Sequence, residues 1–163
     1  MTIMLESPAA AVHARQQVLA RHAELQEVLN YWASSLNQTA AAGSGGRRAP
    51  VVNLLRFFLA DEVLPHAHAE ERTLYRAARR DPAVGPLVQA LLNEHELLKS
   101  MAARLAEPAQ PTAIAAQAEA IAALFASHVA KEDAELLPAL ERSGTDLSSL
   151  LAREPLLAGG TRL

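Results

Sequence analysis

The sequence predicts an all-α protein: an antiparallel up-down-up-down four-helix bundle with a short C-terminal helix or tail. Composition is the first reason, because half of the 163 residues are apolar and only 4% are aromatic. Alanine and leucine, which form helices readily, dominate the apolar set. Periodicity is the second reason, since apolar residues recur at helical spacing over long stretches. Four such stretches of roughly 20–30 residues, joined by short breaks, are typical of a bundle.

The first predicted helix begins at Ser7 and Pro8, an N-cap residue followed by a proline suited to the first helical turn. Apolar residues then recur at helical spacing to about Leu36. The run AAAGSGGRRAP comes next and breaks this pattern. Its glycines and serine predict a flexible loop.

The second predicted helix begins at Pro50 and ends near Arg80. Pro65 falls inside it and cannot donate a backbone hydrogen bond. We therefore expect a local kink or an irregular turn just before His66.

The third predicted helix runs from about Pro86 to Ala106, and EPAQPT forms the next break. The fourth runs from about Thr112 to Arg142 and ends at Ser143-Gly144, a common C-cap. The bundle is thus expected over about residues 8–143 of a single domain spanning 1–163. Residues 144–163 are expected to form one short helix and a loose end.

Charge and composition exclude several classes of function. The formal net charge is −3, with 15 basic and 18 acidic residues mixed along the chain, so no basic stripe indicates a nucleic-acid partner. No cysteine is present, which excludes disulfides, thiolate metal sites and a cysteine nucleophile. The start MTIMLESPAA lacks the features of a secretory signal, and we see no apolar window long enough for a membrane span. We expect a cytoplasmic protein without a membrane partner.

Two nine-residue stretches, in the second and fourth predicted helices, carry nearly the same pattern. HAHAEERTL begins at His66 and HVAKEDAEL begins at His128. Each places a glutamate, Glu70 or Glu132, four residues after its histidine. Residues four apart on a helix point the same way, so each pair is able to face the bundle interior. One such pair arises easily by chance, but two copies with matching flanks are a strong signal.

The first and third predicted helices each carry a lone histidine with matching flanks. LARHAEL surrounds His22 and LNEHELL surrounds His95, so the chain reads as two helical hairpins of one design. An antiparallel bundle brings the four imidazoles and two carboxylates to one level. Six ligands are too many for one tetrahedral zinc ion and suit two octahedral ions that share carboxylate bridges. Nitrogen and oxygen donors without sulfur fit iron or manganese, and zinc is able to occupy the same ligands.

This pattern resembles the hemerythrin-like family, also called the HHE cation-binding domain, over about residues 10–143. The resemblance rests on His22, FFLADEVLPHAHAEERTLY, LNEHELL and LFASHVAKEDAELLP. It implies a left-handed four-helix bundle around a non-haem di-iron centre. Members of the family bind dioxygen, respond to oxygen, nitric oxide or iron, or handle peroxide.

The resemblance also implies a ligand set and a cofactor. The cofactor would be two iron ions, with zinc or manganese as substitutes, and two carboxylates, Glu70 and Glu132, would bridge them. The implied metal ligands are His22, His66, Glu70, His95, His128 and Glu132.

Two positions depart from the pattern of the oxygen-carrying members. Those proteins have a further histidine one turn after the third-helix histidine, where this chain has Lys99. The departure puts simple reversible oxygen carriage in doubt. The carriers also take their fourth-helix carboxylate five residues after the histidine, which is Asp133 here. The internal match to Glu70 favours Glu132 instead, and both readings stay open.

Residues near the proposed ligands carry weaker expectations. His13 and His68 are expected to face solvent, and Glu71 is expected to lie around the ligands or in solvent. Glu62, one turn before His66, either orients that imidazole or lies on the surface. Ten apolar residues close to the ligands are expected to be core, and two of them, Leu98 and Phe125, to wall a dry pocket. These residues are Leu25, Leu29, Leu59, Val63, Leu74, Leu91, Leu98, Phe125, Val129 and Leu136.

Three hypotheses for function follow from the sequence. The first is a di-iron centre whose open position meets dioxygen, nitric oxide or peroxide, for sensing, detoxification or redox homeostasis. The second is iron handling or storage without turnover. The third is a metal-free helical interaction module, which the cost of burying four imidazoles and two carboxylates, several kcal/mol, argues against. The expected partner is the small gaseous or peroxide ligand, and neither enzymatic activity nor oligomeric state is predicted.

Overall fold

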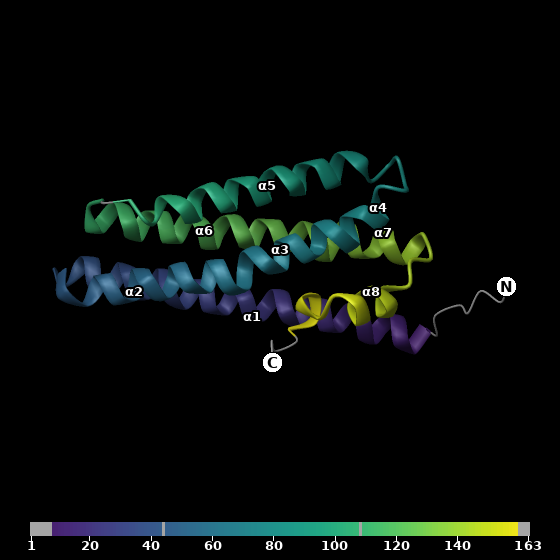
Figure 1. Cartoon of the computed structure of the whole chain (residues 1–163), viewed down its shortest axis with the longest axis horizontal. Coiled ribbons are helices and arrows are strands. Elements are labelled where there is room, and N and C mark those ends of the chain that lie inside the picture. The colour runs from purple at the N-terminus through teal and green to yellow at the C-terminus, as the bar shows by residue number, and fades with distance from the viewer. Residues whose placement is uncertain (1–7, 44, 108, 160–163) are drawn as a thin grey trace.

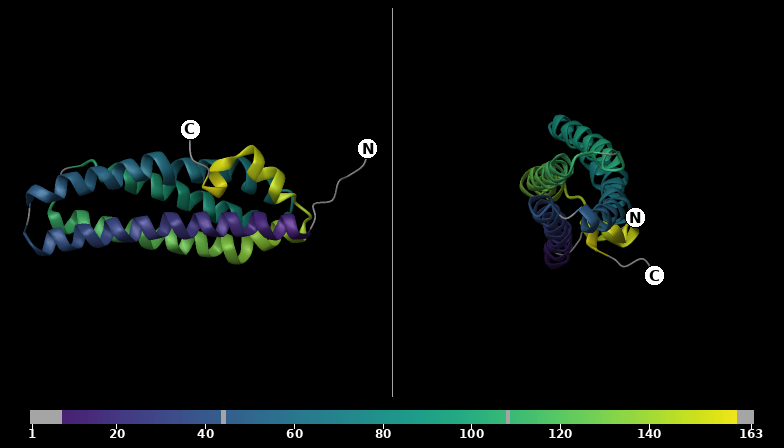
Figure 2. Two further views of the ribbon diagram at one scale, coloured as in Figure 1. Left: turned by 90° about the horizontal axis from the view of Figure 1, so that it is seen from below. Right: turned by 90° about the vertical axis from the view of Figure 1, so that its left-hand side faces the viewer.

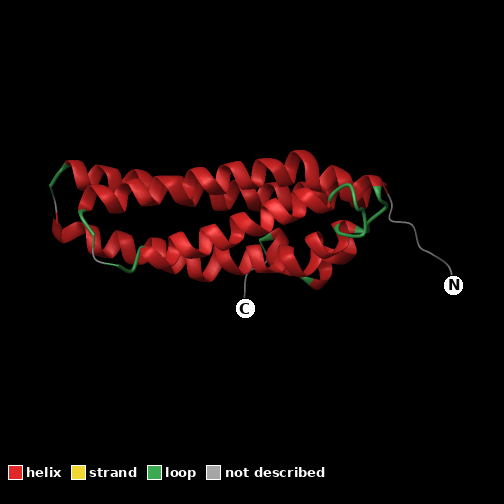
Figure 3. Cartoon of the chain, turned by 90° about the horizontal axis from the view of Figure 1, so that it is seen from above, coloured by secondary structure: helices red, strands yellow, loops and turns green. Residues whose placement is uncertain are grey.

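The structure is a computed structural model that describes residues 8–43, 45–107 and 109–159. Side chains are described for all of these except residues 8 and 45–48. The described chain is helical apart from short connections and contains no strand (Figure 3). The all-α prediction is therefore confirmed, and long helical segments lie side by side along one axis (Figure 1). The N-cap predicted at Ser7 falls outside the described residues.

The first helix is longer than predicted, and the predicted flexible loop is wrong over most of its length. Helix α1 (Pro8–Ala41) continues past Leu36, and α2 (Gly45–Phe58) begins before Pro50. A short turn at Gly43, which adopts a left-handed φ of 64°, is enough to end α1. Pro50 lies inside α2 as its sixth residue, so the helix continues through it without the hydrogen bond that this residue cannot donate.

The second helical segment is interrupted by two π turns, in which backbone hydrogen bonds span five residues. The turn just before His66 confirms the irregularity predicted there. In it, the Leu64 N–H donates to the Leu59 carbonyl, five residues back. Pro65 explains the change, because its ring clashes with the carbonyl four residues earlier and has no N–H to give. After α2 the segment consists of η1 (Leu59–Val63), α3 (Leu64–Glu70), η2 (Glu71–Tyr75) and α4 (Arg76–Ala78).

The third and fourth segments agree with the predicted helices to within two residues at each end. The third segment is a single helix, and the fourth contains one more π turn. That turn also precedes a Leu-Pro pair, Leu137-Pro138, and the Leu137 N–H donates to the Glu132 carbonyl. The elements are α5 (Gly85–Arg104), α6 (Pro111–Lys131), η3 (Glu132–Leu136) and α7 (Leu137–Arg142).

The C-terminal residues contain the one short helix that was expected, and the turn after it is packed where a loose end was expected, so the two form a strap. Helix α8 (Leu147–Arg153) is capped by Asp146, whose carboxylate accepts from the Ser149 N–H at 2.9 Å. A 3-10 turn, η4 (Pro155–Ala158), follows it. Both elements contact α1, and η4 also contacts α3 (Figures 1 and 2). The side chain of Leu157 is fully buried, which fixes this strap against the bundle.

Two apolar clusters fill the bundle, one toward the α1–α2 connection and the other toward α8. The first includes Leu59 and Phe125, and the second includes Leu74 and Leu136. All ten residues predicted as core are buried, with at most 9% of their surface exposed. Leu98 and Phe125 belong to the same apolar cluster, and the dry pocket that they were expected to wall stays a prediction.

One helical stretch, Pro111–Arg142, is long and apolar enough to cross a membrane by length and composition alone. The expectation that the chain has no membrane span stays a prediction. The stretch nevertheless carries His128 and Glu132, both buried, and α6 packs along α1. We assign it to the core of the bundle, because core helices of soluble proteins pass the same test.

Candidate metal centre

A layer of buried polar side chains lies between the two apolar clusters. Every candidate ligand predicted from the sequence is in it, and each exposes at most 4% of its surface. The layer draws on the four long helical segments, so it exists only when all four are packed. Its members are His22 on α1, His66 and Glu70 on α3, His95 on α5, His128 on α6 and Glu132 at the start of η3.

The first group of potential ligands is His22, His66 and Glu70, whose donor atoms lie within 4.8 Å of one another. One oxygen of Glu70, Oε1, lies 3.1 Å from His22 Nε2 and 3.0 Å from His66 Nε2. The spacing of four residues on α3 brings His66 and Glu70 onto the same helix face. Two imidazoles and one carboxylate oxygen therefore point at a common position.

The second group is Glu70, His95, His128 and Glu132, again with donor atoms within 4.8 Å. The Nε2 atoms of His95 and His128 are 3.0 Å apart. The second oxygen of Glu70, Oε2, lies 3.5 Å from His95 Nε2, and Glu132 Oε1 lies 3.5 Å from His128 Nε2. Glu70 thus faces both groups, with one oxygen toward each.

The two carboxylate oxygens of Glu132 also face different groups. While its Oε1 faces His128, its Oε2 lies 3.6 Å from His22 Nε2 in the first group. Asp133 is placed differently: its side chain is 30% exposed, and its Oδ1 lies 2.7 Å from His22 Nδ1, the outer nitrogen of that ring. A residue five positions after His128 is rotated by about 140° on an α-helix, so Asp133 reaches the centre from outside.

The imidazoles of His95 and His128 are held from outside in the same way as that of His22. His95 Nδ1 donates to Glu71 Oε1, and His128 Nδ1 donates to Glu94 Oε2, each over 2.9 Å. Lys131 pairs with the other oxygen of Glu94. Such carboxylate partners fix the ring orientation of a histidine ligand and make it more basic. Glu71 was expected around the ligands, but nothing in the sequence pattern singled out Glu94.

The fourth imidazole, His66, is held by the C-terminal strap. Its Nδ1 donates to the backbone carbonyl of Leu156 in η4 over 3.0 Å. A carbonyl can only accept, so the proton is on Nδ1 and the lone pair on Nε2. The same tautomer follows for the other three rings, whose Nδ1 atoms all face carboxylates. The Nε2 atom of each imidazole therefore faces the interior, where it is available to a metal ion once any proton on it is displaced.

The charge balance of the layer favours added positive charge. Burial by itself lowers the pKa of His22, but hydrogen bonds to Asp133 and Glu70 and the charge of Glu132 raise this pKa to about 10. For His128, burial is likewise outweighed, chiefly by Glu132, and the pKa rises to about 9. These imidazoles would carry protons at neutral pH when nothing else neutralises the carboxylates. Metal cations supply that charge and displace the protons.

The buried charges of the layer also shift the pKa values of Glu70 and Tyr75. Burial raises the pKa of Glu70, but the charge of His66 and the hydrogen bonds of three imidazoles lower it well below its usual range. Burial and then the charge of Glu132 raise the pKa of the Tyr75 hydroxyl. The Glu70 carboxylate is therefore ionised, whereas the Tyr75 phenol keeps its proton.

Unsatisfied atoms provide a direct test of whether metal ions fit. His66 Nε2 and Glu132 Oε2 are buried and have no hydrogen bond of acceptable geometry. Leaving such atoms unpaired costs about 1–3 kcal/mol each, and more when the group is charged. Without metal, the Nε2 atoms of His95 and His128 are joined by a 3.0 Å hydrogen bond, through a proton that a metal ion would displace. The donors and their arrangement therefore fit metal ions, with nitrogen and oxygen ligands only.

Comparison with protein families gives a match to the hemerythrin HHE cation binding domain over residues 13–140. The chain belongs to this hemerythrin family. No curated protein and no solved structure gives a significant match to it. Family membership and the buried cluster of histidines and glutamates together support metal binding.

In this hemerythrin domain, Tyr75 is a member of the centre that sequence reasoning missed. Its hydroxyl donates to Glu132 Oε1 over 2.5 Å and lies 3.2 and 3.3 Å from the Nε2 atoms of His95 and His128. Tyr75 follows Glu70 by five residues, a rotation of about 140° on an α-helix. The π turn η2 encloses one more residue than an α turn and so turns Tyr75 back toward the interior. No proline marks this turn in the sequence.

The remaining residues named in the sequence analysis lie outside the polar layer. Lys99, where oxygen carriers have their additional histidine, is 68% exposed and contributes nothing to the layer. The imidazole of His68 is 64% exposed, and His13 is also exposed, as expected. Glu62 does not orient His66, because it forms an ion pair with Arg21 on α1.

Proposed function

We propose that this hemerythrin domain holds two iron ions, bridged by Glu70 and Glu132, and that the centre binds dioxygen, nitric oxide or peroxide. The observation that carries the proposal is the placement of these two carboxylates. Each has one oxygen facing the first group of imidazoles and the other oxygen facing the second group. A single ion would leave half of this set unused. The iron supplies redox chemistry and an open coordination position when bound.

In this mechanism the protein orients the metal ligands and shields the centre from solvent. His22 and His66 would hold one ion, and His95 and His128 the other, each with Nε2 turned inward by an acceptor at Nδ1. The Tyr75 hydroxyl is the proton donor nearest to the second position, and its raised pKa keeps the proton there. It is therefore placed to donate a hydrogen bond to a small ligand at that ion.

Apolar packing limits what reaches the centre. The ring of Phe125 stacks near His128 with centroids 6.4 Å apart, and Leu98 packs in the same apolar cluster. Water and large polar molecules are disfavoured in such surroundings, whereas small apolar gases are not. The lack of a fifth histidine at Lys99 supports sensing or chemistry over simple reversible oxygen carriage.

Iron handling without turnover is the second candidate. Near-complete burial of all six candidate ligands favours it, because a closed centre retains its metal. The two candidates differ in whether small ligands change the spectrum of the loaded protein.

The proposal includes three broader features. Short connections between consecutive long helices support the antiparallel up-down-up-down order. The absence of cysteine agrees with a cytoplasmic protein whose redox chemistry is confined to the metal. The small ligand is the only partner proposed, with neither nucleic acid nor membrane.

The test is metal analysis and visible spectroscopy after anaerobic loading with ferrous iron. We expect about two irons per chain and near-ultraviolet bands that change on exposure to oxygen, nitric oxide or azide. Two irons with a spectrum that none of these ligands alters would support iron handling instead. Failure to take up iron would overturn both candidates.

Two neighbouring acidic residues provide a matched pair of variants. Glu132→Ala removes a proposed bridge, so we expect it to lose at least one of the two ions. Asp133→Ala removes only the acceptor at His22 Nδ1, so two ions should remain, bound about 10–100-fold more weakly. Loss of iron in Asp133→Ala alone would show that the fourth segment uses the oxygen-carrier spacing.

A further inference from the structure

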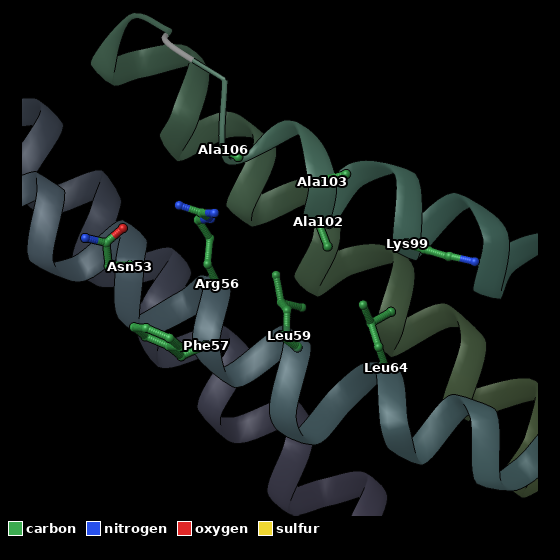
Figure 4. Close-up of a pocket in the computed structure, with 10 residues that line it drawn as sticks. Asn53, Arg56, Phe57, Leu59, Leu64, Lys99, Ala102, Ala103 and Ala106 are labelled. Atoms are coloured by element: carbon green, nitrogen blue, oxygen red, sulfur yellow. The ribbon is translucent and has the colours of Figure 1, made fainter.

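A groove separate from the metal centre opens between the start of the second helical segment and the C-terminal half of α5 (Figure 4). It encloses about 400 Å³. Sites for small organic molecules have volumes of about 300–1,000 Å³. None of the candidate metal ligands lines the groove, so its contents are a separate question from the function proposed above.

The walls of the groove are mainly apolar. Leu59 and Leu64 point from η1 and α3 toward α5 (Figure 4). The facing surface of α5 consists largely of alanines, including Ala102 and Ala103, whose side chains are too short to fill the space. Phe57 stands at the edge with 65% of its surface exposed. Aromatic side chains commonly line sites for small molecules.

The charge of the groove has one sign. Among the described residues that line it, Arg56 and Lys99 are basic and none is acidic, although the whole chain has a net charge of −3. In the described part of the chain, Arg56 has no ion pair or hydrogen bond, and its guanidinium stands over the groove (Figure 4). Lys99 meets only Glu96, at 3.9 Å, with both side chains exposed.

We propose that this groove binds a single-chain anionic amphiphile with the chemistry of a medium-chain fatty acid. The acyl chain would lie along Leu59, Leu64 and the alanines of α5, and the carboxylate would pair with the guanidinium of Arg56. Arg56 suits this role because it is uncommitted and presents a planar pair of donors to a carboxylate. The volume is near the lower end for ligand sites, which fits one chain and not a two-tailed lipid.

The experiment uses the full chain and a displacement assay. The fluorescent anion 8-anilinonaphthalene-1-sulfonate is bound first, and dodecanoate is then added below its micelle concentration. We expect dodecanoate to displace the dye, whereas dodecyltrimethylammonium, with the same chain and a cationic head, should do so at least about tenfold less well. Equal displacement by the two amphiphiles would overturn the proposal.

Three variants locate the binding site. Arg56→Glu should weaken dodecanoate binding about tenfold or more, and Ala103→Trp should abolish it by filling the groove. Arg104→Glu makes the same charge change on α5 outside the groove lining and should have less than about a twofold effect. Equal effects of Arg56→Glu and Arg104→Glu, or unchanged binding in Ala103→Trp, would overturn the proposal.

A final comparison separates this groove from the metal centre, because carboxylates also bind metal ions. Dodecanoate affinity is measured on chelator-treated protein and on zinc-loaded protein. Equal affinities support the groove, independently of whether the iron proposal holds. Binding that appears only with metal would overturn the groove and place the carboxylate on the metal instead.

Discussion

At the scale of single residues, Tyr75 shows how the centre combines metal ligands with a protein hydrogen bond. Its hydroxyl donates to Glu132 over 2.5 Å and contacts the inner nitrogens of His95 and His128. The donor partly neutralises a buried carboxylate and fixes its orientation before any metal arrives. Tyr75 therefore acts on the position of Glu132 as well as on the space beside the second ion.

Replacement of Tyr75 by phenylalanine tests this role. We expect Tyr75→Phe to lower the free energy of unfolding of the metal-free protein by about 1.5–3 kcal/mol, because a hydrogen bond to a buried charge is lost. Iron content should stay at two per chain. Urea denaturation and metal analysis measure both quantities.

The other tyrosine is the matched control for this substitution. Tyr31 is 62% exposed, so Tyr31→Phe should leave the unfolding free energy within about 0.5 kcal/mol of the original. Equal stability of the two variants would contradict the role of the Tyr75 hydrogen bond.

The choice between Glu132 and Asp133 also belongs to this scale. The sequence placed both near His128, and internal symmetry favoured Glu132. In the structure Glu132 is buried between the two groups, whereas Asp133 accepts from the outer nitrogen of His22. Spacing alone could not decide this, because a π turn begins at this point and changes which face each residue occupies.

At the scale of elements, two of the three π turns precede a Leu-Pro pair. Leu64-Pro65 follows η1 and Leu137-Pro138 follows η3. Proline explains both turns, so an irregularity before His66 could be predicted from the sequence. The third turn, η2, has no such signal, and it is the one that carries Tyr75 inward.

The C-terminal strap, α8 with η4, is the element whose importance was least expected. The family match ends at residue 140, yet η4 provides the acceptor for His66 Nδ1. Glu154 at the junction of the two elements pairs with Arg72 at 2.6 Å, and Leu157 is fully buried. The strap thus completes the surroundings of one metal ligand from outside the matched region.

Detaching this strap should weaken metal binding. Leu157→Asp puts a carboxylate at a fully buried position, which costs several kcal/mol unless η4 leaves the bundle. His66 then loses its acceptor, so we expect the affinity for cobalt(II) to fall about 10–100-fold with helix content retained. Competition with a chelator and circular dichroism measure these outcomes.

The control for this prediction is Leu156→Ala, which keeps the backbone carbonyl that His66 uses. Its metal affinity should stay close to that of the original protein. If Leu157→Asp also bound metal normally, the strap would be a structural element without influence on the centre.

At the scale of the whole molecule, the polar layer divides the apolar core into two clusters. Each cluster is stabilised by ordinary apolar burial, worth about 25 cal/mol per Å² removed from water. The layer between them holds buried imidazoles and carboxylates, and two of their atoms, His66 Nε2 and Glu132 Oε2, have no hydrogen bond. Metal binding and stability of the bundle should therefore be linked, because the donor atoms converge only in the folded chain.

Thermal unfolding with and without metal tests this linkage. A ligand present at 100 times its dissociation constant stabilises the folded state by about 2.7 kcal/mol. For a chain of this length, each kcal/mol added to the free energy of unfolding raises the melting temperature by about 2–4 °C. We expect loading with metal to raise the melting temperature by roughly 5–11 °C over chelator-treated protein. Coincident melting curves would favour the metal-free interaction module, and His128→Ala should abolish any shift.

The sequence by itself determined the helices, the apolar core and the six residues of the polar layer. These features follow from local rules: helix propensity, apolar periodicity and the four-residue spacing of His66–Glu70 and His128–Glu132. The break after α1 was mispredicted because the glycines and serine before Pro50 favoured a flexible loop, although one left-handed residue, Gly43, was enough to end the helix.

Only the tertiary structure decided the partners of those six residues. Glu94, Tyr75 and the carbonyl of Leu156 reach the centre from other segments, and a backbone carbonyl has no side-chain signal in the sequence. The groove between α2 and α5 likewise depends on two distant surfaces facing each other. Such contacts depend on the relative placement of helices, which packing of the whole chain sets and local periodicity does not encode.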